Sequence, residues 1–417
     1  MTKKSDAPAI RFKGFSDAWE QRKLGELVDR VVRKNTNNES TLPLTISAQY
    51  GLVDQITYFN NRVASRDVSN YYLVLNGEFA YNKSTSDGYP FGAVKRLDLY
   101  EKGVLSTLYI VFSPKKEQQV DSDFLTVFFD TDRWHKGVAE RAAEGARNHG
   151  LLNISAEDFF DIDLSVPKDV AEQKQIGAFI RQLDNLITLH QRKFEKLTNV
   201  KKSMLEKMFP QNGSSYPEIR FKGFTDPWEQ RKLSEMCGTF EYGLNAAAKE
   251  FDGKNKYIRI TDIDDASREF LLSDLSSPDI CLDGMSKYLL SSGDIVFART
   301  GASVGKTYIY RENDGIVYFA GFLIRAKVNQ DNDAEFVFQS TLSPSYEKYI
   351  RITSQRSGQP GVNAQEYGEY DLFAPSKEEQ QRIGHFLRGI DNLITLHQRE
   401  LEKLQNIKKS MLEKMFV

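Results

Sequence analysis

This sequence contains an internal duplication, which constrains the fold more than any other feature. Residues 11–27 and 220–236 are identical at 13 of 17 positions. Residues 172–209 and 379–416 are identical at 28 of 38 positions. A solenoid would need several short units stacked on one another, so two long copies instead predict a duplicated domain with pseudo-two-fold character.

The stretches between the repeated blocks, residues 28–171 and 237–378, are nearly equal in length, at 144 and 142 residues, but share little sequence. Both are typical of mixed α/β structure. Their glycine-punctuated apolar runs predict strands at residues 77–81, 103–107, 108–112, 293–298, 306–310, 315–319 and 322–326. A helix is expected next in each, over about residues 123–143 and 333–353. The shared order indicates diverged copies of one fold.

The repeated C-terminal blocks carry apolar residues in steps of three and four, which is the heptad period of a left-handed coiled coil. Each block would form a helix roughly 55–60 Å long at ~1.5 Å per residue. Because a globular block separates the copies, the second helix can return beside the first as an antiparallel pair. The predicted seam includes Ile180, Leu183, Ile187, Leu197, Met204, Leu387, Ile390, Ile394, Leu404 and Met411.

Polar residues interrupt this seam at equivalent places, namely His190 and His397, and Lys201 and Lys408. We interpret them as residues that specify the register of the pair at some cost in stability. A metal site made from the two histidines alone is the less favoured interpretation.

Prolines 167 and 375 mark the start of each helical block, where a strand has to end. The sequence therefore predicts a duplicated α/β (α+β) fold, with two globular domains separated by two long antiparallel coiled-coil helices. The expected divisions are residues 1–167 for the first globular domain, 168–213 for the first helix and a linker, 214–375 for the second globular domain, and 376–417 for the second helix.

The 417-residue chain has a formal net charge of −2 and a pI near 6.3, which excludes a strongly basic protein that coats nucleic acid. Two cysteines, Cys237 and Cys281, cannot form a disulfide framework or a cysteine-rich zinc site. The first ten residues lack the apolar core of a secretory signal, and no run approaches the ~20 apolar residues that span a bilayer. We therefore expect a cytoplasmic protein without membrane contact.

Several segments imitate enzyme motifs without their full pattern. Residues 301–307 resemble a phosphate-binding loop, but three residues rather than four separate the glycines, and strands are expected on both sides. Asp226-Pro-Trp228 lacks the second proline of the motif of amino-methyltransferases, and no glycine-rich cofactor loop accompanies it. Five histidines and two cysteines show no metal-ligand spacing. We expect no catalytic residue, no metal and no cofactor in this chain.

Several repeated motifs together point to a family. Trp-Glu-Gln-Arg-Lys-Leu occurs at 19–24 and 228–233, Glu-Gln-x-x-Ile-Gly at 172–177 and 379–384, and Gly-Asp-Ile-Val-Phe-Ala-Arg-Thr-Gly at 293–301. With two divergent blocks between near-identical helical blocks, the whole chain resembles the specificity subunits of Type I restriction–modification systems.

The resemblance implies that each divergent block is a target recognition domain, which reads one half of a bipartite site on double-stranded DNA. It implies that the helices set the gap between the halves and dock two methyltransferase subunits. Restriction and translocase subunits would complete the complex, which methylates adenine and cleaves unmodified DNA. S-adenosylmethionine, ATP and Mg²⁺ would belong to these partners.

Charge is distributed unevenly between the helical blocks and the remainder of the chain. The blocks 172–209 and 379–416 carry 8 basic against 4 acidic and 7 basic against 5 acidic residues, which leaves −8 elsewhere. Bulk charge therefore cannot give the divergent blocks the usual non-specific affinity for phosphates. We expect weak DNA binding by the chain alone and tight binding by the assembled complex.

Base reading favours arginine for guanine and amides for adenine, while lysine and hydroxyl groups contact phosphates. Four polar loops occupy corresponding places in the two divergent blocks, which makes them the candidate DNA-binding segments. The candidates are Asn82, Lys83, Ser84, Arg147, Asn148 and His149 in the first block, and Arg299, Thr300, Ser303, Lys306, Gln355, Arg356 and Gln359 in the second. They could also be ordinary solvated loops.

Two other classes of protein remain as alternatives. A coiled-coil scaffold that binds other proteins through its two variable domains would explain the seam and the mild acidity equally well. It explains less well why two domains of one fold diverge between constant flanks. A self-contained methyltransferase or nuclease would need to bind its cofactor without partners.

Overall fold

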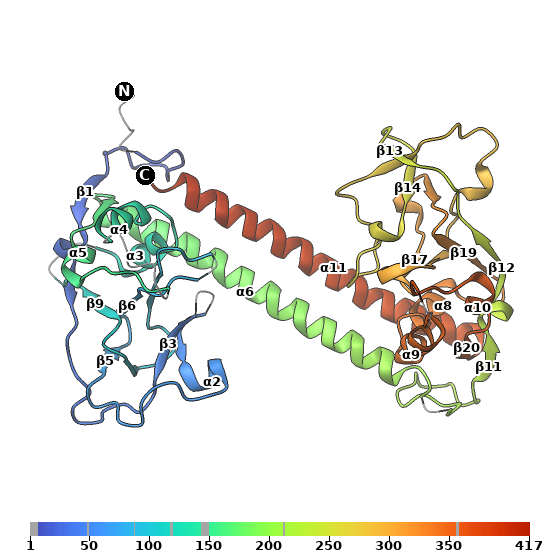
Figure 1. Ribbon diagram of the computed structural model, residues 1–417, viewed down its shortest axis with the longest axis horizontal. Coiled ribbons are helices and arrows are strands. Elements are labelled where there is room, and N and C mark those ends of the chain that lie inside the picture. The colour runs from blue at the N-terminus through green and yellow to red at the C-terminus, as the bar shows by residue number, and fades with distance from the viewer. Residues whose placement is uncertain are drawn as a thin grey trace. The chain divides into compact units, whose positions relative to one another are not determined.

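The computed structural model describes residues 7–47, 50–86, 88–116, 120–142, 150–211, 213–355 and 358–417. The chain forms two compact units (Figure 1). Unit 1 comprises residues 1–189 and 401–417, and unit 2 comprises residues 190–400. Each unit is built on a similar plan.

Unit 1 is centred on a four-stranded antiparallel sheet in the order β2-β9-β6-β7. These strands are β2 (Val28–Arg30), β9 (Ile110–Pro114), β6 (Phe79–Asn82) and β7 (Ala93–Arg96). Three antiparallel two-stranded ladders accompany the sheet. They pair β1 (Glu20–Lys23) with β10 (Asp163–Val166), β3 (Leu44–Ser47) with β4 (Gly51–Asp54), and β5 (Tyr72–Leu75) with β8 (Lys102–Leu105).

Unit 2 repeats the same four-stranded arrangement in the order β12-β19-β16-β17. The strands are β12 (Cys237–Tyr242), β19 (Leu323–Val328), β16 (Asp294–Ala298) and β17 (Thr307–Ile309). The accompanying ladders pair β11 (Glu229–Lys232) with β20 (Asp371–Ala374), β13 (Ala248–Glu250) with β15 (Ser276–Pro278), and β14 (Lys256–Ile258) with β18 (Val317–Phe319). The β14–β18 pair is parallel.

Short helices cover these sheets. In unit 1 they are α1 (Leu24–Leu27), α2 (Gln55–Phe59), α3 (Ser122–Phe129), α4 (His135–Arg141) and α5 (Ala156–Phe160). In unit 2 they are α7 (Leu233–Met236), α8 (Ala334–Ser340), α9 (Pro344–Thr353) and α10 (Ala364–Gly368), with 3-10 turns at Ile260–Asp262, Ser286–Tyr288, Gly301–Ser303 and Glu312–Asp314.

The seven strands predicted from the sequence are confirmed, with ends within two residues of those expected. The single helix expected after them is wrong in both blocks, because each is two helices, α3 and α4 or α8 and α9. In unit 2 the break lies at Ser343, which caps α9 before Pro344. Proline has no N–H to continue the preceding helix, and a serine side chain satisfies the first free donors of the next one.

The two predicted long helices are confirmed as α6 (Val170–Lys207) and α11 (Lys377–Lys414). Each begins in one unit and ends in the other. Ile180 and Leu183 on α6 are fully buried in unit 1, and Leu387 and Ile390 on α11 are buried in unit 2. The other predicted seam residues are half-buried, namely Ile187, Leu197, Met204, Ile394, Leu404 and Met411.

The aromatic core of each unit joins the two repeated blocks. In unit 1, Trp19 packs edge-on against Phe416, with ring centroids 6.1 Å apart. In unit 2, Trp228 packs in the same way against Phe209 at 6.2 Å. The tryptophan of one copy thus meets the phenylalanine two residues beyond the long helix of the other copy, which places the start of one long helix beside the end of the other within each unit (Figure 1).

Candidate nucleic-acid interface

The polar loop after β6 in unit 1 is held by the segment that precedes α5. Thr85 N donates to Gly150 O at 2.7 Å, and Leu152 N donates to Lys83 O at 3.0 Å. Asn82 Oδ1 accepts from Ser84 N at 3.0 Å, which fixes the start of the loop. Arg147, Asn148 and His149 lie outside the described residues, directly before Gly150.

The corresponding loop of unit 2, after β16, is held in the same way. Gly301 N donates to Pro360 O at 3.0 Å, and Val362 N donates to Arg299 O at 2.9 Å. The isolated bridges Ser84–Leu151 and Thr300–Gly361 are equivalent contacts of the two units. In both units, therefore, the loop that follows β6 or β16 is joined to the described residues just before α5 or α10, and these two joined segments form a loop pair at one end of the central sheet.

The remaining candidates of unit 2 surround this loop pair. Gln359 Nε2 lies 3.0 Å from the position of a Cβ at Gly301, whose φ is +71°. Gln355 and Gln359 are exposed, Thr300 and Ser303 are half-buried, and Arg356 lies outside the described residues. A side chain at position 301 would be strained and would crowd the neighbouring amide, so the turn requires glycine.

The three basic candidates that lie among the described residues differ in their pairing. Lys83 Nζ donates to Ile154 O at 3.3 Å, and Lys306 Nζ lies 2.5 Å from Asp265 Oδ1. The guanidinium of Arg299 instead lies over two aromatic rings, those of Tyr242 and Phe322. The two rings were not predicted to lie beside Arg299, because their proximity to it depends on the pairing of β12 with β19.

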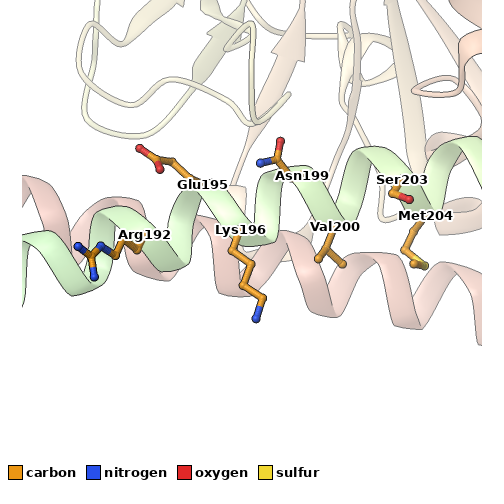
Figure 2. A pocket seen from close by; sticks show the side chains of 7 residues that line it. All are labelled: Arg192, Glu195, Lys196, Asn199, Val200, Ser203 and Met204. Atoms are coloured by element: carbon orange, nitrogen blue, oxygen red, sulfur yellow. The ribbon is translucent and has the colours of Figure 1, made fainter. Parts of the chain in front are cut away.

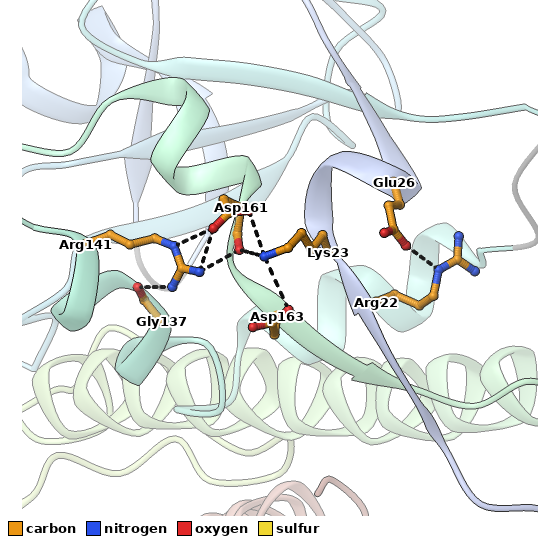
Figure 3. A network of polar contacts seen from close by, with 7 residues as sticks. All are labelled: Arg22, Lys23, Glu26, Gly137, Arg141, Asp161 and Asp163. Atoms are coloured by element: carbon orange, nitrogen blue, oxygen red, sulfur yellow. Dashed lines mark hydrogen bonds and ion pairs between the residues drawn. The ribbon is translucent and has the colours of Figure 1, made fainter.

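A cluster of ion pairs fixes the end of α4 in unit 1, just before the segment that contains Arg147. Arg141 Nη2 donates to Asp161 Oδ2 at 2.8 Å, and Lys23 Nζ lies 2.7 Å from Asp161 Oδ1 (Figure 3). Hydrogen bonds from Lys23 and then Arg141 lower the pKa of Asp161. Since the Asp161 side chain is 52% exposed, the cluster orients α4 without adding much stability.

Charged residues link the two long helices within each unit. In unit 1, Lys408 Nζ lies 2.7 Å from Asp184 Oδ1 and 3.6 Å from Asp130 Oδ2. Burial disfavours the charged form of Lys408, but the two carboxylates outweigh this and raise its pKa. In unit 2 the equivalent residue Lys201 pairs with Asp391. Each lysine thus pairs with the aspartate of the opposite helix, which agrees with a role in setting register.

The two seam histidines contact each other in unit 2, with His190 Nδ1 and His397 Nδ1 3.1 Å apart. One imidazole can donate to the other only while one of the facing nitrogens is unprotonated. Burial, followed by the charges of His190 and Lys193, lowers the pKa of His397. The hydrogen bond between the two imidazoles can therefore form at neutral pH, where His397 is uncharged.

A bidentate ion pair ties each repeated N-terminal segment to the start of a long helix. Arg11 Nε and Nη2 lie 2.6 and 2.7 Å from the oxygens of Glu172 in unit 1. Arg220 makes the same contacts with Glu379 at 2.7 and 2.8 Å in unit 2. Both carboxylates are almost completely buried, so each pair fixes how a repeated N-terminal segment meets its long helix.

The long helices also present unpaired apolar surface. Leu186 and Leu189 on α6 are exposed, as are the equivalent Leu393 and Leu396 on α11. In unit 2, the surface of α6 has an open hollow of about 510 Å³. Figure 2 shows its lining residues, Arg192, Glu195, Lys196, Asn199, Val200, Ser203 and Met204.

Within the part of the chain that the structure describes, no three histidine, cysteine or acidic side chains are grouped as metal ligands. Among the same residues, no helix is long and apolar enough to cross a membrane. The described residues of the loop pairs offer hydrogen-bond donors and acceptors for binding.

The chain is similar to known proteins over most of its length. The family model described as the Type I restriction modification DNA specificity domain matches residues 17–199 and again 225–406. The specificity subunit of the Type I restriction enzyme MjaVIII from Methanocaldococcus jannaschii is 24% identical over 370 residues, which cover 85% of this chain and 82% of that protein. The crystal structure of a Type I S subunit from M. genitalium superposes with a TM-score of 0.64 at 14% identity, covering 99% of both chains.

Proposed function

Because the chain belongs to the Type I restriction–modification DNA specificity family, we propose that it is the subunit that recognises the DNA sequence. Each recognition domain reads one half of a bipartite site on double-stranded DNA. The observation that carries this proposal is the loop pair at one end of the central sheet. The pair has the same backbone contacts in both units but different side chains. Constant geometry with divergent side chains is what two readers of different sequences require.

The helical blocks carry a joint charge of +6, while the remainder of the chain carries −8. Recognition therefore relies on local donors at the loop pairs, and the partner subunits supply most of the phosphate contacts. The helices α6 and α11 set the gap between the half-sites. Their continuous 38-residue lengths and the Lys–Asp pairs between them support a rigid spacer.

The exposed leucines of the two helices form the docking sites for two methyltransferase subunits. Leu186 and Leu189 are matched by Leu393 and Leu396 one repeat later, so two identical partners would find two equivalent surfaces. Exposed apolar side chains on a long helix favour burial against a partner helix. Restriction and translocase subunits join this core, and the partners hold S-adenosylmethionine, ATP and Mg²⁺.

Exchange of one recognition block tests whether each recognition domain reads its own half of the site. Residues 28–171 are replaced with the corresponding block of a relative that directs a different motif, and adenine methylation is mapped in cells that express the cognate methyltransferase. We expect one half of the motif to change while the other half and the gap stay the same. A change in both halves would contradict the proposal.

Docking is tested by placing a charge among the exposed leucines. Leu189→Glu together with Leu396→Glu should abolish co-purification of the methyltransferase, because the new carboxylates would be buried without partners. Thr188→Glu adds one such carboxylate at the adjacent exposed position, on a different face of α6, and serves as the control. Equal loss of the methyltransferase in both variants would refute the assignment of this face.

A further inference from the structure

Arg299 is held in place from both sides at the end of β16. Its N–H donates to Phe322 O at 3.1 Å, and its carbonyl accepts from Val362 N at 2.9 Å. Its guanidinium carbon lies 5.1 Å from the centre of the Tyr242 ring and 5.8 Å from that of the Phe322 ring. Both distances are within the range of cation–π attraction, which restricts the side chain without neutralising it.

Among the described residues, Arg299 forms no ion pair with a carboxylate, and its buried Nε has no hydrogen-bond partner. Other basic side chains nearby are neutralised. Arg325 pairs with Glu241 and Asp294, and Lys306 pairs with Asp265. Arg299 is thus a positioned cation whose charge is not cancelled, in a domain that is otherwise acidic.

The two rings beside Arg299 are exposed to an unusual degree for aromatic side chains. Phe322 is 56% exposed and Tyr242 is 45% exposed. By strand register, the matching positions of unit 1 are Leu108 and Val32, which are 61% and 58% exposed. Both units therefore present two apolar side chains at the same place, beside a basic residue that follows the central strand.

Exposed apolar groups around a charged one are typical of the centre of a binding surface, where they exclude water from the polar contact. On DNA, the arginine fork fits the O6 and N7 acceptors of guanine in the major groove, and apolar neighbours contact thymine methyl groups or base faces. Lys83, the matching residue of unit 1, donates to Ile154 O and lacks the fork. Both units share the apolar pair, but among the described residues an arginine fork beside it occurs only at Arg299 of the second recognition domain.

We infer that Arg299 reads a guanine in the half-site of the second recognition domain, and that Tyr242 and Phe322 hold its guanidinium in the reading orientation. This inference rests on the proposed function. It assigns the base and the supporting residues. Because a bidentate arginine–guanine contact carries much of the discrimination at its base pair, loss of the fork should reduce preference for G·C there ~10- to 100-fold.

The test uses the complete complex with its methyltransferase and measures methyl transfer to duplexes in which each base pair of the motif is changed in turn. Arg299→Lys keeps the charge but removes the fork. Phe322→Leu keeps an apolar side chain but removes the ring. We expect both to relax one G·C position of one half-site and to leave the other half unchanged. Replacing that guanine with 7-deazaguanine should slow the wild type but have little further effect on Arg299→Lys.

Lys327→Gln is the matched control, because Lys327 is an exposed basic residue at the opposite end of β19, paired in register with Asp294. It should retain full discrimination. Equal weakening of Arg299→Lys on all duplexes, with discrimination intact, would show a phosphate contact and overturn the inference. Full discrimination in Arg299→Lys would also overturn it. Failure of the proposed function is distinguishable, since the wild-type complex would then methylate no bipartite motif.

Discussion

The bidentate pair between Arg220 and Glu379 gives the most demanding energetic test. Glu379→Gln keeps the shape of the side chain but removes its charge, and so leaves the Arg220 side chain, of which only 15% is exposed, without its bidentate ionic partner. Breaking a buried ion pair on one side costs about 3–5 kcal/mol. We take about 3 kcal/mol here, because some solvent still reaches the arginine. The repeated segment around Arg220 should then open ~150-fold more often.

Hydrogen exchange measures this opening at Ile219, whose N–H donates to Lys207 O at 2.9 Å beside the ion pair. Its exchange should accelerate in Glu379→Gln, while the equivalent amide of Ile10, bonded to Lys414 O, should not change. Glu172→Gln should reverse this pattern between the units. Less than tenfold acceleration, or equal acceleration at both amides, would refute the reasoning.

The remaining predictions concern the long helices. Burial and neighbouring charge lower the pKa of His397 in the folded chain. The contact with His190 should therefore contribute fully above pH 6.5 and be lost as the pH falls through the lowered pKa. His397→Asn should make the melting temperature less dependent on pH between 7.5 and 5.0, and an unchanged dependence would contradict this assignment. Gly384→Ala should destabilise unit 2 by about 1–3 kcal/mol, because its Cβ would lie 2.6 Å from Asp333 Oδ1. Gly389→Ala, in open space on the same helix, should instead stabilise the chain by about 0.5–1 kcal/mol in chemical denaturation. Equal effects of the two alanines would contradict the packing argument.

Much of the fold could be predicted because the duplication separates the repeated helical blocks from the divergent globular blocks. The heptad period fixed the long helices, and the prolines at 167 and 375 located their starts. The break between α8 and α9 was missed because periodicity continues across Ser343-Pro344, although this pair is itself a typical helix-start signal. The serine cap and the proline start a new helix here, although the apolar periodicity continues across them.

The recognition surface could be predicted only in part. Polar residues after strands β6 and β16 were found because loops at corresponding places share a composition. Tyr242 and Phe322 were not found as neighbours of Arg299, because their proximity depends on the pairing of β12 with β19 and on the bulge between Cys237 and Phe240. The partnership of Arg220 with Glu379 likewise joins residues 159 positions apart. Sequence separation of this size leaves no local signal.

We propose that this chain determines which DNA sequence is modified. The most direct measurement is a genome-wide map of adenine methylation in cells that express the cognate methyltransferase with and without this chain. We expect a split motif with a fixed, unspecified gap that disappears when the chain is deleted and returns when it is restored. An identical methylation map in both strains, with the methyltransferase present, would contradict the account.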